Sequence, residues 1–92
     1  MAIEMRQDLP GFTREQAAAI AALVNDHART APGFIAHASG PIAGGYHVTE
    51  FWESQEAFER FSRAVIMPLM QQLGVRPGSP PQYLPIDNVL TR

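Results

Sequence analysis

The sequence of 92 residues contains no cysteine. Disulfides, thiolate nucleophiles and thiolate metal ligands are therefore excluded. No apolar run approaches the roughly 18 residues that a membrane-spanning helix requires, and no signal-peptide pattern opens the chain. We therefore expect a cytoplasmic protein that makes no membrane contact.

The chain also lacks a large net charge: the net charge is −2, and no basic run is present. Nothing in this pattern favours binding to nucleic acid or to an anionic membrane. The 3 histidines lack the clustered spacing that is typical of a metal site. No helix pattern follows Gly44-Gly45, so this pair indicates a turn and not a phosphate-binding loop. We expect neither a metal nor an organic cofactor.

The length predicts a single domain over residues 1–92. A strand is predicted over 2–9, where apolar Ile3 and Met5 alternate with charged residues. Thr13 and Gln16 have the spacing of a capping box, which predicts a helix over 14–28. Its predicted apolar stripe contains five residues: Ala17, Ile20, Leu23, Val24 and His27.

Two strand-like runs, residues 34–40 and 45–52, are separated by a glycine-rich stretch and predict a hairpin of open register. Ser54 is the predicted N-cap of a second helix. Pro68 should break or kink that helix near Met67.

Gly74 is the predicted terminator of the second helix. A short last strand follows over 81–90, and Pro85 confines it to a sheet edge because proline has no N–H to donate.

The predicted order βαββαβ is that of a ferredoxin-like α+β sandwich with both helices on one face of the sheet. The opposite face still carries large groups, since both alternations of the 45–52 strand are bulky. A chain this short also buries only about 60–65% of its unfolded surface. We therefore expect a homodimer in which a second copy covers the free face.

Three stretches carry a resemblance to a known family: "PGFIAHASGP" at 32–41, "GGYHVTEFWESQEAFERF" at 44–61 and "PIDNVL" at 85–90. Together they resemble the dimeric α+β barrel superfamily, in its antibiotic-biosynthesis-monooxygenase-like branch. The most specific part is the Trp-x-Ser-x-x-Ala-Phe run from Trp52 to Phe58.

The resemblance implies a homodimer whose two sheets close into one barrel, with a pocket in each subunit between sheet and helices. The family includes cofactor-independent monooxygenases of aromatic polyketides, haem-degrading enzymes, lactone isomerases, polyketide cyclases and many proteins of unknown role. In oxygenases of the family, an asparagine that helps to position the substrate precedes the tryptophan by four residues. This chain has Val48 at that position.

Four residues are expected to contact a ligand: Trp52, Tyr46, Val48 and Phe58. An indole offers a large apolar area and one donor, so Trp52 fits the packing of a core as well as the stacking of an aromatic ligand. Tyr46 and Tyr83 each have a phenol that could bond a ligand oxygen, and both are also common strand residues.

Three residues are candidate general bases: His37, His47 and Glu50. A neutral imidazole moves protons near neutral pH, and a partly buried carboxylate beside a tryptophan is a plausible base. The alternatives are strand histidines bonded to backbone or solvent, and a Glu50 paired with Arg6 or Arg60. If 37 pairs with 47 in the hairpin both imidazoles share a face, whereas a slip of one residue separates them.

These expectations favour a cofactor-independent, monooxygenase-like enzyme that abstracts a proton from a small hydrophobic, aromatic or polyketide-like molecule. A cyclase or isomerase would use the same base and stop before reaction with oxygen. The alternative of another class is a non-catalytic dimeric binder of small molecules.

Overall fold

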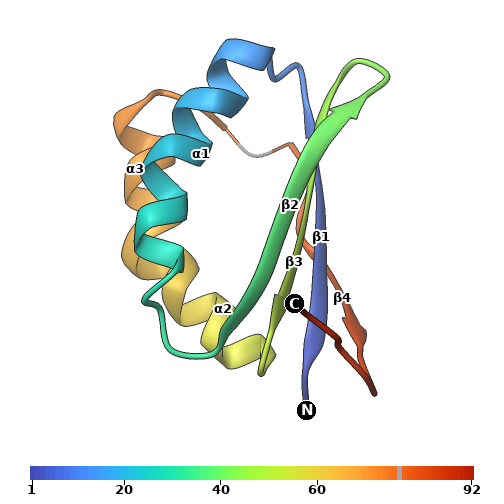
Figure 1. The fold of residues 1–92 in the computed structure, drawn as a ribbon. Coiled ribbons are helices and arrows are strands. Elements are labelled where there is room, and N and C mark those ends of the chain that lie inside the picture. The colour runs from blue at the N-terminus through green and yellow to red at the C-terminus, as the bar shows by residue number, and fades with distance from the viewer. Residues whose placement is uncertain (77) are drawn as a thin grey trace.

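The structure is a computed structural model that describes residues 1–76 and 78–92. One antiparallel sheet of 4 strands, in the order β2-β3-β1-β4, is covered on one face by helices (Figure 1). This arrangement confirms the ferredoxin-like α+β sandwich. The elements are β1 (Ile3–Pro10), α1 (Arg14–Ala28), β2 (Phe34–Ile42), β3 (Gly45–Trp52), α2 (Gln55–Phe61), the π-helical turn η1 (Ser62–Ile66), α3 (Met67–Gln72) and β4 (Gln82–Pro85).

The helix α1 begins at the predicted capping box. The Thr13 hydroxyl accepts a hydrogen bond from the Gln16 amide at 3.1 Å, and the Gln16 side chain accepts one from the Thr13 amide at 3.0 Å. Both bonds satisfy amides that have no partner within the helix. The predicted bounds of this helix, 14–28, are those observed.

The buried stripe of α1 differs from the predicted one. Val24 and Ala28 are buried, whereas Leu23 is 47% exposed and His27 is also exposed. The helix is therefore rotated so that residues four apart, Val24 and Ala28, face the sheet together.

The second helical region contains a π turn ahead of Pro68. The Met67 amide donates to the Ser62 carbonyl five residues earlier, and α3 then begins with Pro68 in its first turn. Proline in the first turn of a helix costs little, because that position needs no amide donor. The break predicted near Met67 is confirmed, but the irregularity starts earlier, at Ser62.

The helix α3 ends at Gly74, as predicted. Gly74 has φ +69°. Its amide donates to the Gln71 carbonyl at 3.2 Å, and the Val75 amide donates to the Met70 carbonyl at 2.9 Å. This pair of bonds is a Schellman motif, whose left-handed residue is usually glycine.

Among the described residues, no helix combines the length and the apolar character needed to cross a bilayer.

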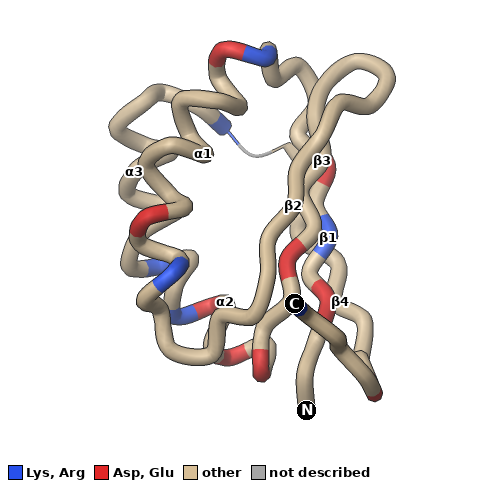
Figure 2. The backbone as a smooth tube through the Cα atoms, in the orientation of Figure 1, with Lys and Arg blue, Asp and Glu red and all other residues tan. Residues whose placement is uncertain are grey.

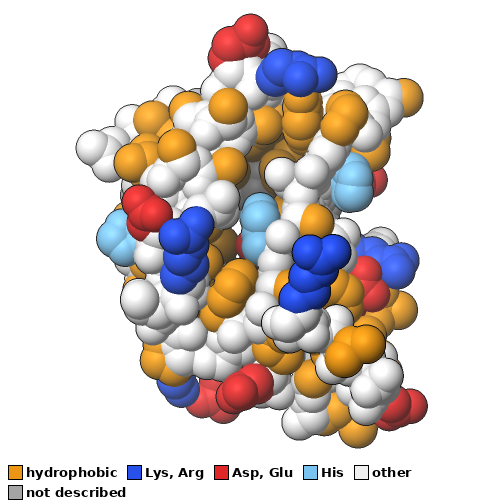
Figure 3. All heavy atoms as spheres, viewed as in Figure 1, with side chains coloured by type: hydrophobic (Ala, Val, Ile, Leu, Met, Phe, Trp, Pro, Cys, Tyr) orange, Lys and Arg blue, Asp and Glu red, His pale blue; other side chains and the backbone are white. Residues whose placement is uncertain are grey.

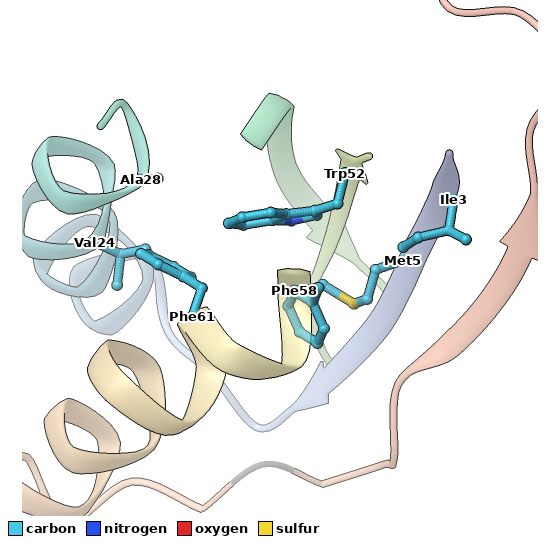
Figure 4. Packing of buried hydrophobic residues seen from close by; sticks show 7 residues of the cluster. All are labelled: Ile3, Met5, Val24, Ala28, Trp52, Phe58 and Phe61. Atoms are coloured by element: carbon cyan, nitrogen blue, oxygen red, sulfur yellow. The ribbon is translucent and has the colours of Figure 1, made fainter. Parts of the chain in front are cut away.

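The core is organised around Trp52, which is 0% exposed. Its indole extends from β3 toward the helices, where it meets the rings of Phe58 and Phe61 (Figure 4). The ring centroid of Trp52 lies 5.2 Å from that of Phe61, 5.3 Å from that of Phe34 and 5.9 Å from that of Phe58. These separations are favourable for aromatic pairs. The buried cluster consists of Ile3, Met5, Val24, Ala28, Trp52, Phe58 and Phe61.

The sheet face away from the helices is mixed in character. Because Ile3 and Met5 are buried toward the helices, the alternating Glu4, Arg6 and Asp8 of β1 point to the other face. Figure 2 shows that β1 carries charged positions of both signs. The face is thus less uniformly apolar than the sequence indicated, and the homodimer stays a prediction. The strand β4 pairs only with β1 and lies at the edge of the sheet, as Pro85 predicted.

We predict that Gly33→Ala destabilises the chain more than Gly44→Ala does. Both glycines have positive φ, +87° and +79°, so both substitutions add a strain of about 1–2 kcal/mol. A Cβ at Gly33 would also lie 2.7 Å from the Ala57 Cβ, whereas nothing lies within 4 Å of one at Gly44. The overlap should cost about 1–3 kcal/mol more in unfolding free energy, measured by urea titration. Equal losses in the two variants would contradict this.

Candidate functional site

A cavity of about 800 Å³ lies between the helices and the sheet. One wall is formed by β1, β2 and β3, and the other by α1, η1 and α3 with the residues that follow α3. Figure 3 shows a hollow between the two layers, with a histidine side chain at its wall. The volume is typical of sites that enclose a small molecule.

The hairpin register brings His37 and Glu50 together. His37 of β2 pairs with Glu50 of β3, and Glu50 pairs in turn with Met5 of β1. Directly paired residues have side chains on the same face of the sheet. Since Met5 faces the helices, His37 and Glu50 face them too, and all three line the cavity.

Glu50 accepts two hydrogen bonds that link the core to the cavity. The Trp52 indole Nε1 donates to Glu50 Oε1 at 2.8 Å, and His37 Nδ1 lies 2.7 Å from Glu50 Oε2. Glu50 is 3% exposed, while the His37 side chain is 18% exposed. The carboxylate is thus enclosed, and the imidazole stands between it and the open cavity.

The pairing with Glu50 defines the protonation of the His37 ring. An ionised carboxylate only accepts hydrogen bonds, so His37 Nδ1 carries the proton in this contact. In the neutral form of the ring, His37 Nε2 is then the nitrogen without a proton. No described residue hydrogen-bonds to Nε2. A carboxylate that fixes the tautomer of an imidazole in this way leaves a basic nitrogen free for a ligand.

The sequence-predicted ligand contacts divide into two groups. Val48 and Phe58 line the cavity together with His37 and Glu50. Trp52 and Tyr46 are not among the described residues that line it. Trp52 instead contacts the Glu50 carboxylate from within the core.

His47 lies on the opposite face of the sheet from His37. It pairs with Gly40 and with Asp8, and a Cβ added at Gly40 would lie 3.5 Å from its Nε2. Because side chains alternate along a strand, His47 points away from Glu50. The two imidazoles are therefore separated, and His47 is not among the described residues that line this cavity.

The alternative partners of Glu50 are engaged elsewhere. Arg6 contacts Glu4 at 2.6 Å, and Arg60 contacts Glu56 at 2.8 Å.

Within residues 1–76 and 78–92, no group of three His, Cys, Asp or Glu side chains could hold a metal ion.

Tyr83 packs against the cavity residue Phe58, with ring centroids 6.0 Å apart. Burial raises the pKa of Tyr83, and the nearby Glu59 carboxylate adds to this effect. The phenol therefore stays protonated over a wide pH range and acts as packing behind Phe58.

Several polar residues of the cavity were not identified from the sequence: Gln7, Ser39, Ser62, Gln71 and Arg76. The position of Ser39 two residues beyond His37 was a usable signal, because strand residues two apart share a face. Gln7 has the same relation to Met5 on β1, whereas Ser62, Gln71 and Arg76 depend on how the layers dock.

Comparisons with known proteins identify the fold. No family model matches the chain, and no curated protein matches it significantly. Among solved structures, the chain is similar to SnoaB, a cofactor-independent oxygenase from Streptomyces nogalater, with TM-score 0.69, 12% identity and coverage of 99% of this chain and 97% of that one.

Two further solved structures are similar. One is a mutant of MhuD with two manganese protoporphyrin IX molecules bound per active site, with TM-score 0.64, 17% identity and full coverage of both chains (100% each). The other is the monooxygenase from the gene ActVA-Orf6 of Streptomyces coelicolor with the ligand nanaomycin D, with TM-score 0.55, 20% identity and coverage of 99% and 91%. The chain therefore shares the α+β fold of SnoaB, MhuD and the ActVA-Orf6 monooxygenase.

Proposed function

We propose that this chain is a cofactor-independent enzyme that abstracts a proton from a small hydrophobic, aromatic or polyketide-like molecule. His37 is the base, and Glu50 holds it. The observation that carries the proposal is the 2.7 Å contact between His37 Nδ1 and the buried Glu50 carboxylate at the wall of the cavity.

The lining of the cavity supports a hydrophobic ligand. Apolar side chains from both layers, among them Val48, Ile66 and Met70, surround the imidazole. Methionine is flexible and polarisable, and it packs well against aromatic rings. A planar apolar body fits such a lining, with its reacting group directed at His37.

The first chemical step is a proton transfer from an acidic C–H or phenol of the substrate to His37 Nε2. Glu50 stabilises the imidazolium that forms and keeps the ring oriented. The electron pair left on the substrate makes it a carbanion or its delocalised phenolate form. This anion is electron-rich enough to reduce dioxygen directly.

The second step uses dioxygen as the oxidant. Two electrons pass from the carbanion to O2, a C–O bond forms, and the imidazolium returns its proton to the peroxide oxygen. Loss of water from the hydroperoxide, with the second hydrogen of the same carbon, then breaks the O–O bond and leaves a carbonyl. In balance, a CH2 group and O2 become C=O and H2O.

Similarity in fold to SnoaB and to the ActVA-Orf6 monooxygenase supports the oxygenase version of this reaction. A cyclase or isomerase would share the first step only, and the carbanion would be reprotonated or would attack a carbonyl of the same molecule. A binder would share the cavity without the proton transfer.

We predict that His37→Ala lowers turnover about 10²-fold or more, because the proton acceptor is lost. Glu50→Gln should lower it about tenfold or more, since a neutral amide neither fixes the tautomer nor stabilises the imidazolium. The measurement is oxygen uptake with anthrone, whose methylene carbon is acidic, together with absorbance of the quinone product. His47→Ala is the matched control and should keep full activity, because His47 lies on the other face.

Deuterium exchange into anthrone separates the alternatives. Exchange that depends on His37 without oxygen uptake would favour the cyclase or isomerase. Binding of anthrone with neither exchange nor uptake would favour the non-catalytic binder. Full oxygenase activity in the His37→Ala variant would contradict the assignment of the base.

The proposed assembly is a homodimer formed through the free face of the sheet. Phe51 and Ala38 of that face, with Leu84 of the edge strand, offer apolar area beside the charges of β1. Sedimentation should give about 20 kDa, twice the 10.1 kDa of one chain.

Deletion from Pro81 onward, which removes β4, should weaken the dimer and lower the melting temperature. A monomer at micromolar concentration, or a truncated chain with unchanged dimerisation and melting, would contradict this assembly.

A further inference from the structure

The described residues that line the cavity include one arginine, Arg76. The described ion pairs of other arginines involve Arg6 and Arg60, and no described acidic side chain pairs with Arg76. A guanidinium presents five donors in a planar fork that matches a carboxylate. An arginine of this kind at the edge of an apolar cavity has unused capacity to bind an anion.

Arg76 follows α3 and lies two residues before Gly78. Gly78 packs at Pro10, where the end of β1 pairs with Gly45 of the hairpin. The Gln7 side chain donates to the Ser79 carbonyl at 2.7 Å, and a Cβ on Gly78 would lie 2.5 Å from Pro10 Cδ. Gly78 and Ser79 are therefore fixed closely against the second half of β1.

The two charged groups of the cavity lie at different levels of β1. Glu50 pairs with Met5, whereas the segment after Arg76 packs at Pro10, the end of the strand. Five residues separate these levels, which corresponds to about 16 Å along a strand. Between them the sheet wall of the cavity carries apolar Leu9 and Val48 beside polar Gln7 and Ser39. This space suits an elongated body of two or three fused rings.

We propose that the cavity takes a planar aromatic carboxylate, with the carboxylate on Arg76 and the opposite end of the ring system at His37. The carboxylate pairs with the guanidinium by charge-assisted hydrogen bonds at the rim, where solvent still reaches. The Glu50 carboxylate does not compete for Arg76, because both its oxygens are occupied by Trp52 and His37. The choice of reacting end rests on the proposed function, whereas the anion site does not.

The test is a comparison of two ligands of the same shape, anthraquinone-2-carboxylate and anthraquinone-2-carboxamide, by isothermal titration calorimetry. The wild-type chain should bind the carboxylate about fivefold to tenfold more tightly, a modest preference because the rim is exposed. Arg76→Gln should abolish the preference and leave the affinity for the carboxamide unchanged. Added salt should reduce the preference in the wild-type chain only.

Arg63→Gln is the matched control, since it removes the same charge from an exposed position of η1 outside the cavity lining. It should keep the preference. Equal binding of the two ligands by the wild-type chain, the same loss in both variants, or no binding of either ligand would overturn the proposal. Because binding is measured without turnover, an inactive His37 leaves this result intact. Turnover that depends on His37 with no carboxylate preference would overturn the Arg76 site alone.

Discussion

The buried carboxylate of Glu50 is the group on which both the core and the site depend. Enclosing a carboxylate costs several kcal/mol of lost hydration, and the cost is offset only where good donors replace water. Trp52 and His37 are those donors, at 2.8 Å and 2.7 Å. The indole that occupies the centre of the aromatic cluster therefore also fixes the carboxylate, and the carboxylate fixes the imidazole.

This coupling assigns different roles to three residues that are close in sequence or in register. Trp52 acts from inside the core and has no exposed surface. In the proposed function, Glu50 positions the imidazole, and His37 is the base. The sequence left Trp52 open between core packing and ligand stacking, and in the structure it packs in the core and donates a hydrogen bond to Glu50.

Local patterns were sufficient to predict the order of the elements, although the last strand, predicted over 81–90, covers only Gln82–Pro85. The capping box at Thr13 defined the start of α1, and Pro85 defined the edge strand. The register of the hairpin was not predictable, because one residue of slip exchanges the two faces of a strand. The turn decides it: Gly44 has φ +79°, and Ile42 pairs with Gly45, which places His37 opposite Glu50.

Other features of the site depend on how layers dock. The rotation of α1 exposes Leu23, although periodicity alone fits that residue to the buried stripe. The location of Arg76 depends on a contact between Gln7 and Ser79, which are 72 residues apart in the sequence. Patterns of charge and hydropathy within a window of the chain carry no information about such contacts.

The account makes His37 a neutral imidazole whose Nδ1 proton is held by Glu50. Long-range ¹H–¹⁵N correlation spectra of the labelled chain at mildly alkaline pH report directly which ring nitrogen carries the proton. They should show the His37 proton on Nδ1 with Nε2 bare, and Glu50→Gln should remove this preference while His47 is unaffected. A His37 ring protonated at Nε2 in the wild-type chain would contradict the account, because no basic nitrogen would then face the cavity.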